Sequence, residues 1–494
     1  MLDAQGFRKN RMELPGWPVD LRAVLRECAI IGGLIPSLRR WIGLTLSRRS
    51  PQDQGERRAR GILQGTAFGL AARIFEILVT IASVPLTVGY LGTERYGAWV
   101  TIVSVLLFLS STDFGLAGSL TNALARADAG GARDVGQRYV SSAIFVFSLI
   151  GLAILAVGIA FSPHIAAFLF PALHSPGLRT EVVIAVAIAL VILGLNFPLL
   201  ITERVLAAHQ ENSFAHVWHM AGSIGNLVAL LAVIWFHGGL WLLVLACFGL
   251  RLATSFASAI WLFTSRRPWL RPRLASVDPA LAKNLFADGW KFFVINIGWV
   301  INSQTDNVVI AHYLGPAQVT PYAVTFGLFM AATLLQTIAY PSLWPAYTEA
   351  YARGDYGWIR RTMRSNLIFS SITTLTLVTV LTIFGREIIR LWAGPGAVPP
   401  FPVIVWMAAW RLMLSTLLVG SCLLNATGHL KGMTIYGTIT ALLNLLFSIF
   451  LVQRFGITGV IAGTVIAFAL ANYIPTFIEV RNVLRKMSVR AAAQ

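Results

Sequence analysis

Charged side chains are scarce in this sequence, and their scarcity excludes a soluble globular domain. Asp, Glu, Lys and Arg make up 12% of the 494 residues, whereas soluble domains carry roughly 25%. The mean hydropathy is +0.70. Long apolar runs recur along the chain, and they lack the alternation with polar residues that marks the strands of a transmembrane barrel. The sequence therefore predicts an all-α membrane protein.

Signatures of catalytic and metal sites are also missing. The three cysteines, Cys28, Cys247 and Cys422, do not have the spacing of a zinc site or of a disulfide framework. We find no Walker A motif, nucleophile elbow or aspartate-rich diphosphate motif. His216 and His219 share a helical face, but no carboxylate is obviously placed to complete a metal site with them. We therefore expect no metal, no cofactor and no enzymatic activity.

Twelve apolar segments follow residue 61, and each is long enough to cross a bilayer as a helix. They cover about 62–89, 97–122, 139–161, 182–203, 214–236, 239–264, 287–312, 319–345, 364–384, 401–424, 432–452 and 457–478. The connections at 237–238 and 453–456 are so short that a glycine divides one long hydrophobic stretch into two. The predicted fold is a polytopic bundle of about 12 transmembrane helices.

Acidic residues are outnumbered by basic ones, 21 against 39, which gives a formal net charge of +18. In a membrane protein this excess reflects the enrichment of Lys and Arg on the cytoplasmic side, so we do not expect nucleic acid as a partner. The connections after even-numbered segments, with their edges, hold 14 Lys and Arg residues, against 5 for those after odd-numbered segments. This asymmetry places both termini in the cytoplasm.

The distribution of charge divides the chain into five parts. Residues 1–60 form a basic cytoplasmic extension, partly disordered or lying at the membrane interface. Residues 61–264 and 287–480 contain six apolar segments each, and the Arg-rich stretch 265–286 is expected to be a cytoplasmic linker between these two halves. Residues 481–494 form a cytoplasmic tail.

Short words recur at matching places in the two halves. The sequence Tyr-Leu-Gly follows the first segment at 90–92 and the seventh at 313–315, and Asn-Leu occurs in the fifth at 226–227 and in the eleventh at 444–445. The offsets, 223 and 218 residues, are nearly equal. Because each half has an even number of segments, a duplication relates the halves by a pseudo-two-fold axis along the membrane normal.

Several motifs together resemble one family of membrane proteins. They are Leu91-Gly92, Tyr96-Gly97 and Asp113-Phe114-Gly115-Leu116 in the first half, and Gln304-Thr305-Asp306, the sequence HYLG at 312–315, Asn425-Ala426-Thr427-Gly428 and the sequence GITGVIAGTVIA at 456–467 in the second. This set resembles the polysaccharide-export flippases, among them O-antigen and exopolysaccharide flippases. These belong to the multidrug/oligosaccharidyl-lipid/polysaccharide (MOP) exporter superfamily. The resemblance covers about residues 62–480.

The resemblance implies a MATE-like fold of two six-helix lobes, with a central cavity that opens alternately to each side of the membrane. The cargo would be a lipid-linked oligosaccharide on polyprenyl diphosphate, moved across the bacterial inner membrane for exopolysaccharide or lipopolysaccharide biosynthesis. Membrane lipids would surround the protein, and glycosyltransferases and a polysaccharide polymerase would be its partners. The alternatives are an ion-coupled exporter of drugs or metabolites in the same superfamily and, less favoured, a membrane polysaccharide polymerase or ligase.

Basic residues within the apolar segments are candidates for holding the anionic head group of such a cargo. A charge at the bilayer centre costs roughly 2.5–3.5 kcal/mol, so such residues usually face a cavity or the bundle interior. The candidates are Arg73, Arg251, Arg411 and Lys291. A structural ion pair of Arg73 with Glu76, which lies three residues later, stays open as an alternative. So do packing of Arg411 on Trp410 and snorkelling of Lys291 to the membrane surface.

Three acidic residues in the same segments are candidates for coupling transport to H⁺ or Na⁺. They are Glu76, Asp306 and Asp113. Asp306 occurs in a polar cluster with Asn302 and Asn307, and both a coupling and a structural role are open for it. Asp113 precedes a Phe-Gly pair that can bend a helix, which favours a structural role.

Overall fold

The computed structural model describes residues 54–111, 115–173 and 175–493, and it divides the chain into two units, Met1–Ala67 and Phe68–Gln494. The predicted N-terminal extension at 1–60 lies almost entirely outside the described residues. Its end, from Gln54, is the start of the first described helix, α2. The description that follows concerns the second unit.

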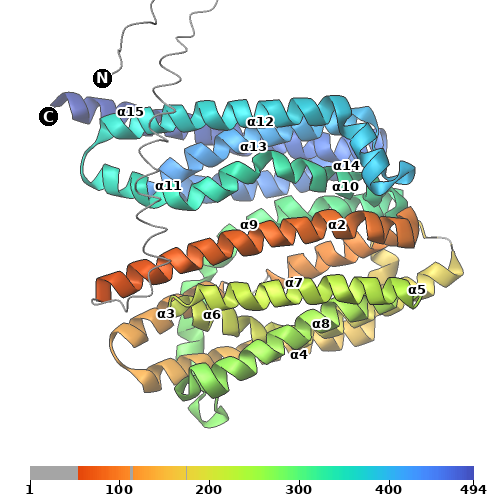
Figure 1. Ribbon diagram of the computed structural model, residues 1–494, viewed down its shortest axis with the longest axis horizontal. Coiled ribbons are helices and arrows are strands. Elements are labelled where there is room, and N and C mark those ends of the chain that lie inside the picture. The colour runs from red at the N-terminus through yellow and green to blue at the C-terminus, as the bar shows by residue number, and fades with distance from the viewer. Residues whose placement is uncertain (1–53, 112–114, 174, 494) are drawn as a thin grey trace, which may run out of the picture. The chain divides into compact units, whose positions relative to one another are not determined.

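Helices make up the described chain, and no strand occurs among its described residues. In the first half they are α2 (Gln54–Ser110), α3 (Leu116–Ala129), α4 (Arg133–Leu169), α5 (Pro176–Asn196), α6 (Leu200–Ala208), α7 (Asn212–Trp235) and α8 (Leu240–Trp261). In the second half they are α9 (Pro279–Leu314), α10 (Val319–Met330), α11 (Leu334–Ala352), α12 (Tyr356–Ala393), α13 (Phe401–Ala426), α14 (Leu430–Phe468) and α15 (Ile474–Ala493) (Figure 1). Each of the twelve predicted segments corresponds to one helix, one arm of a bent helix or two consecutive helices, so the all-α polytopic prediction is confirmed.

Glycines in left-handed or extended positive-φ conformations make the sharpest turns between spans. Gly92 (φ 73°, ψ 174°) divides α2 into two arms, and Gly456 (φ 58°, ψ −142°) divides α14 in the same way. Gly315, which ends α9, has φ 84° and ψ 161°, nearly the conformation of Gly92. A positive φ is strained for residues with a Cβ. The two copies of the Tyr-Leu-Gly word therefore form equivalent turns, as the proposed duplication requires.

Several predicted segments differ from the structure in continuity, among them 182–203, in which a 3₁₀ turn at Phe197–Leu199 separates α5 from α6. The segment 97–122 is not one helix, because α2 ends at Ser110 and α3 begins at Leu116, after Gly115 with φ 70°. The segment 319–345 is interrupted by a 3₁₀ turn at Ala331–Thr333. At the end of the chain, the expected tail from residue 481 continues α15 as a helix to Ala493.

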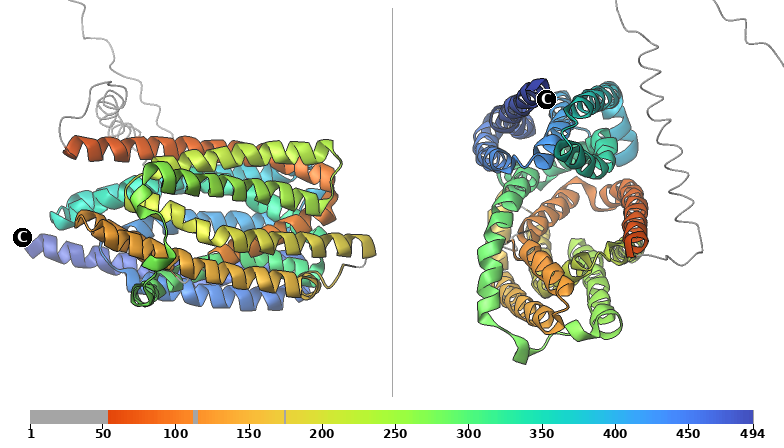
Figure 2. Two further views of the ribbon diagram at one scale, coloured as in Figure 1. Left: turned by 90° about the horizontal axis from the view of Figure 1, so that it is seen from below. Right: turned by 90° about the vertical axis from the view of Figure 1, so that its left-hand side faces the viewer.

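The helices of the second unit pack in two groups that meet along α9. Figure 2 shows α10–α15, in teal to dark blue, gathered apart from α2–α8, in red to green. Within the groups, α4 packs on α5 and α7 on α8, while α13 packs on α11, α12 and α14. Helix α9 contacts α3 and α4 of the first group and α10 and α14 of the second. It therefore belongs to the packing of both halves.

Two glycines of the sequence motifs permit the closest approaches between the halves. A Cβ added to Gly97 would lie 1.7 Å from the carbonyl oxygen of Pro316, and one added to Gly115 would lie 1.8 Å from the carbonyl oxygen of Gly289 in α9. No side chain fits at such distances, so each glycine is required by backbone contact. The Tyr-Gly and Asp-Phe-Gly motifs thus hold glycines at contacts between the two halves.

The predicted linker at 265–286 consists of short helical turns followed by the start of α9. It contains a π-helical turn and two 3₁₀ turns, and Asp278 then caps α9 by accepting hydrogen bonds from the backbone N–H groups of Ala280 and Leu281. Arg138 of α4 forms an ion pair with the same carboxylate. The N–H of Ala280 above all, with further help from Arg138, lowers the pKa of Asp278. The linker is therefore fastened to the first half at the point where α9 begins.

Candidate functional site

A cavity of about 570 Å³ lies within the first half, enclosed by α2, α6, α7 and α8. Its polar lining consists of Thr80, Ser83, Thr202, Glu203, His219, Ser223, Asn226, Arg251, Thr254, Ser255 and Ser258, and its aromatic lining of Trp99, Trp218 and Phe248. Such a volume is in the usual range for a small-molecule site. A hydroxyl-rich, charged cavity among helices this apolar indicates a place where a polar ligand can reside.

Among the sequence-predicted cations whose side chains are described, Arg251 is the one in the wall of this cavity. It lies on α8, ten residues before the end of the helix at Trp261. No ion pair of Arg251 occurs among the described residues, although the charge of Glu203, in the same cavity wall, interacts with it. A guanidinium with five donors in this position is suited to a phosphate or carboxylate group.

Glu203 and His219 of the cavity were not predicted as site residues. Glu203 was not singled out from the sequence, and His219 was noted without a carboxylate partner. His219 of α7 lies with its Nε2 atom 3.0 Å from Oε1 of Glu203, on α6. The sequence analysis found no carboxylate for this histidine, because Glu203 lies on another helix and 16 residues earlier. The position of Glu203 could have indicated this pairing, because it is the last residue of a predicted apolar segment, where a carboxylate needs a partner.

A second polar cluster is buried in the other half, around Asp306 of α9. The Tyr322 hydroxyl of α10 donates to Oδ2 of Asp306 at 2.5 Å, and the Thr464 hydroxyl of α14 donates to the same atom at 2.9 Å. Asn444, on the other arm of α14, donates to the amide oxygen of Asn302 at 3.1 Å. Asp306 is only 6% exposed. Of the neighbours expected from the sequence, Asn302 is linked to Asp306 through Asn444 and Thr464, whereas Asn307 donates to Ser104, and the bonds to the carboxylate itself come from Tyr322 and Thr464.

Arg411 of α13 does not line a cavity in this structure, which departs from the expected placement. The residue is 1% exposed, and its guanidinium lies 4.4 Å from the ring centroid of Trp410 and 5.0 Å from that of Phe326. It donates, at 3.4 Å in each case, to the Thr333 hydroxyl and to the Phe326 carbonyl. This geometry matches the alternative of aromatic and carbonyl packing, which stabilises the buried cation without a carboxylate but leaves its Nε–H without a hydrogen-bond partner among the described residues.

The other four candidates cannot be placed as side chains. Asp113 lies outside the described residues, and the side chains of Arg73, Glu76 and Lys291 are not described, although their backbone is helical in α2 and α9. The pairing of Arg73 with Glu76 and the expected roles of all four stay predictions.

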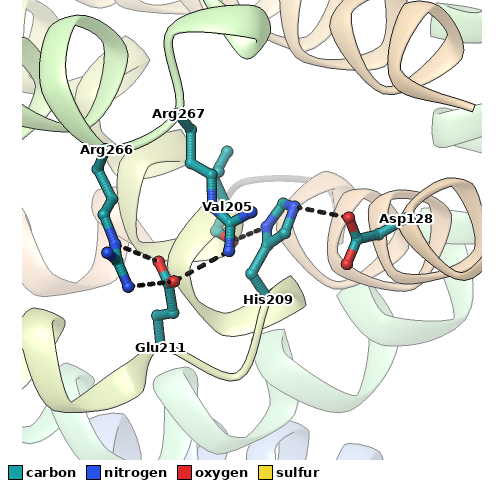
Figure 3. A network of polar contacts seen from close by, with 6 residues as sticks. All are labelled: Asp128, Val205, His209, Glu211, Arg266 and Arg267. Atoms are coloured by element: carbon teal, nitrogen blue, oxygen red, sulfur yellow. Dashed lines mark hydrogen bonds and ion pairs between the residues drawn. The ribbon is translucent and has the colours of Figure 1, made fainter. Parts of the chain in front are cut away.

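A network of ion pairs at one end of the first half ties its helices to the linker (Figure 3). Glu211, before α7, accepts from Arg266 at 2.7 Å and from Arg267 at 2.9 Å, and Nε2 of His209 lies 3.6 Å from Asp128 of α3. Each charge in this network faces an opposite one. We therefore assign it to holding α3, α6, α7 and the linker together rather than to a ligand.

Comparison with known proteins places these features in context. Residues 62–351 match the model of the family described as polysaccharide biosynthesis protein. The chain is 21% identical over 406 residues to a putative O-antigen transporter of Salmonella typhimurium, covering 80% of this chain and 90% of that protein. It is 23% identical over 430 residues to a putative O-antigen export protein of Yersinia pseudotuberculosis, covering 83% and 93%.

Solved structures show the same fold. The inward-facing conformation of a multidrug resistance MATE family transporter of the MOP superfamily aligns with a TM-score of 0.67 and 16% identity, covering 83% of this chain and 99% of that one. An outward-facing conformation of such a transporter aligns with a TM-score of 0.60 and 16% identity, covering 87% and 97%. The predicted MATE-like fold is thereby confirmed.

Proposed function

Because the chain belongs to the polysaccharide biosynthesis protein family, we propose that it moves lipid-linked oligosaccharides across a bacterial inner membrane for exopolysaccharide or O-antigen synthesis. The relatives from Salmonella and Yersinia, which carry O-antigen transport or export in their names, support this proposal over most of the chain. Family membership and a transporter fold support a transport protein and not an enzyme. No observation favours the drug-exporter or polymerase alternatives over it.

The observation that carries the proposal is Arg251 in the wall of a polar cavity. A polyprenyl diphosphate presents an anionic head, which the guanidinium would bind in bidentate fashion. The sugar units would follow into the hydroxyl-lined part, where Ser, Thr and Asn side chains exchange hydrogen bonds with sugar hydroxyls. The apolar faces of sugar rings would pack on Trp99 or Trp218, while the prenyl chain stays in lipid. Arg73 and Lys291 are proposed as further cations along the path, whereas Arg411, which is buried against Trp410 and Phe326, is proposed to act in packing instead.

Asp306 is the carboxylate best suited to couple transport to an ion. It is buried, and its Oδ1 atom has no hydrogen-bonding partner among the described residues. Binding of H⁺ or Na⁺ would satisfy this atom and neutralise a costly buried charge. Ion binding would change the strength of the hydrogen bonds that Tyr322 of α10 and Thr464 of α14 donate, because both are made to this carboxylate. Glu76 and Asp113 stay proposed coupling residues.

Alternating access would require the contacts between the halves to open in turn. Gly97 against Pro316 and Gly115 against Gly289 are contacts of backbone with backbone, and the side-chain hydrogen bonds that also join the halves, such as Asn307 to Ser104, would have to break. The backbone contacts themselves can part and meet again with little rearrangement. We further propose that both termini are cytoplasmic, and that glycosyltransferases and a polysaccharide polymerase are the functional partners.

Transport in proteoliposomes tests the proposal. The full chain is reconstituted with a fluorescent lipid-linked oligosaccharide, and a membrane-impermeant quencher reports its movement between leaflets, with and without imposed H⁺ or Na⁺ gradients. Arg251→Gln is expected to slow movement roughly tenfold, since about 1.4 kcal/mol of binding corresponds to that factor. Arg454→Gln is the matched control, because Arg454 lies on the Phe450 ring outside the cavity. Absence of movement in the wild type, under any gradient, would refute the function.

The anionic-cargo part has its own test. If Arg73, Arg251 and Arg411 can each be replaced by Gln with normal transport and a folded protein, the cargo is not held by these cations.

A further inference from the structure

Three ionisable residues from three helices meet in the cavity of the first half. They are Glu203 of α6, His219 of α7 and Arg251 of α8. The ion-pair distance between Glu203 and His219 is 3.0 Å, and their side chains are 46% and 34% exposed. Both groups can therefore exchange protons with water in the cavity. This cluster was absent from the sequence predictions, and the proposed function uses Arg251 alone.

One proton changes the charge that this cluster presents to a ligand. With His219 neutral, the charges of Glu203 and Arg251 cancel, and the cluster is neutral. With His219 protonated, the cluster carries one positive charge. Histidine ordinarily titrates near pH ~6.5, within the range that cells experience. An anion entering the cavity would thus meet either no net charge or a net cation.

The described residues around the cluster contain few other charges that could obscure this change. Arg204 and Arg251 are the cations whose charges act on Glu203 besides His219. The described lining residues of α2 near the cluster, Val79, Thr80 and Ser83, are uncharged. The side chains of Arg73 and Glu76, earlier on α2, are not described. His216, three residues before His219 on α7, is not among the residues that line the cavity.

We propose that His219 is a proton-operated second cation of an anion site whose first cation is Arg251, with Glu203 orienting the imidazole, and that the ligand is a phosphate or diphosphate group. The proposal rests on the proposed function for the identity of that group as the head of the cargo. Glu203 acts as a positioning residue: it holds the ring at the cavity wall and offsets the charge of Arg251 while the site is empty. Binding of the anion then takes up a proton at His219.

Calorimetric titration of the purified full chain in detergent tests this inference. The probes are farnesyl diphosphate, inorganic diphosphate and, as the uncharged counterpart, farnesol. Each is titrated at about pH 5.5 and about pH 8, on either side of the ordinary histidine range. Titrations in buffers of different ionisation enthalpy also give the number of protons taken up. Comparable binding of the two diphosphates identifies a site for the anion itself, and a preference for farnesyl diphosphate identifies a lipid head-group site.

The variants separate the role of each residue. For each protein, the affinity for the diphosphates at the lower pH is divided by the affinity at the higher pH. This ratio should be roughly five- to tenfold larger for wild type than for His219→Gln, since a unit charge several ångströms away contributes about that factor. The ligand's own titration is common to both proteins and drops out of this comparison. Glu203→Gln should bind more tightly than wild type at the higher pH and show a smaller pH dependence. His216→Gln, the matched control, should behave as wild type in affinity and proton uptake.

Two results would overturn the inference, and they are distinguishable. If wild type and His219→Gln show the same pH dependence and the same proton uptake, with both proteins folded by their thermal transitions, His219 is not part of the site while the proposed function stands. If wild type binds farnesyl diphosphate no better than farnesol at either pH, the cavity does not bind the anion, and both the inference and the anionic-cargo part of the proposed function are wrong.

Discussion

The Tyr322 hydroxyl donates a 2.5 Å hydrogen bond to the Asp306 carboxylate, joining α10 to α9 in the interior of the second half. Thr464 donates to the same oxygen from α14. Removing the first bond tests what this carboxylate does for stability. Tyr322→Phe keeps the ring and should destabilise the protein by about 1–3 kcal/mol, the usual loss for a buried bond to a charged group. The measurement is chemical or thermal unfolding in detergent, and an unchanged transition would contradict the expectation.

Asp306→Asn tests coupling separately from folding. The amide cannot bind or release a proton in the physiological range and is a poorer ligand for Na⁺ than a carboxylate. We expect a folded protein whose transport no longer responds to the gradient that drives the wild type. Thr464→Val is the companion variant, because it removes a bond to the carboxylate but leaves the charge. A gradient response in Asp306→Asn equal to that of the wild type would exclude Asp306 as the coupling residue.

Gly97→Ala should disturb the contact between the halves. The added methyl group would lie 1.7 Å from the Pro316 carbonyl oxygen, so the backbones must separate. We expect a cost of about 1–3 kcal/mol, typical of overpacking, and slower transport. Gly89→Ala is the matched control, since nothing lies within 4 Å of its new Cβ and it sits in the same helix. Equal transition temperatures and transport rates for the two variants would show that the close approach does not matter.

Replacement of Arg411 distinguishes packing from cargo binding. Arg411→Met keeps a long side chain against Trp410 and Phe326 and removes a buried charge, so a structural role predicts a folded and active protein. A role in holding the anionic cargo predicts a folded protein with transport reduced about tenfold or more. The buried geometry leads us to expect the first outcome. Size-exclusion profiles and the proteoliposome assay together decide between them.

Acid should loosen the start of α9 through Asp278. Its pKa is lowered in the folded protein, chiefly by the N–H of Ala280, so the carboxylate's contribution is fully present above the ordinary pKa of about 3.9. That contribution is lost as the pH falls through the lowered value. Asp278→Ala, which removes the cap, should increase amide exchange at Ala280 and Leu281 at neutral pH. Asp278→Asn, which can still accept these bonds, should retain most of the protection and lose the pairing with Arg138.

Much of the fold could be predicted from the sequence, because apolar length and glycine position act locally. The twelve segments and the turns at Gly92, Gly315 and Gly456 follow from hydropathy and from backbone conformations that favour glycine. The sequence allowed a bend at the Asp-Phe-Gly motif but not the end of α2 at Ser110, and it did not predict the 3₁₀ turns at Phe197–Leu199 and Ala331–Thr333. Local composition at both 3₁₀ turns is mainly apolar, so tertiary packing decides the interruption there, while at Gly115 the close contact with Gly289 requires a glycine.

The candidate site was predictable only in part, because its residues come from different helices. Arg251 could be identified as a solitary cation in an apolar segment. The pairing of His219 with Glu203 could not, since it depends on how α6 packs against α7. For Arg411, the charge alone suggested a role in binding a ligand. In the structure the guanidinium is instead contacted by the aromatic ring and the carbonyl group of Phe326, which lies on another helix. Sequence neighbours do not reveal such partners.

Helix α9 links a docking point of the first half to the polar cluster of the second. Gly289, where Gly115 docks, and Asp306 are 17 residues apart on this one helix, which is roughly 26 Å along its axis. A tilt of only about 5° about Gly289 would therefore displace Asp306 by about 2 Å, enough to break the bond from Tyr322. Helix α9 would then convert a small movement at Gly115 into a larger displacement of the Asp306 carboxylate in the other half.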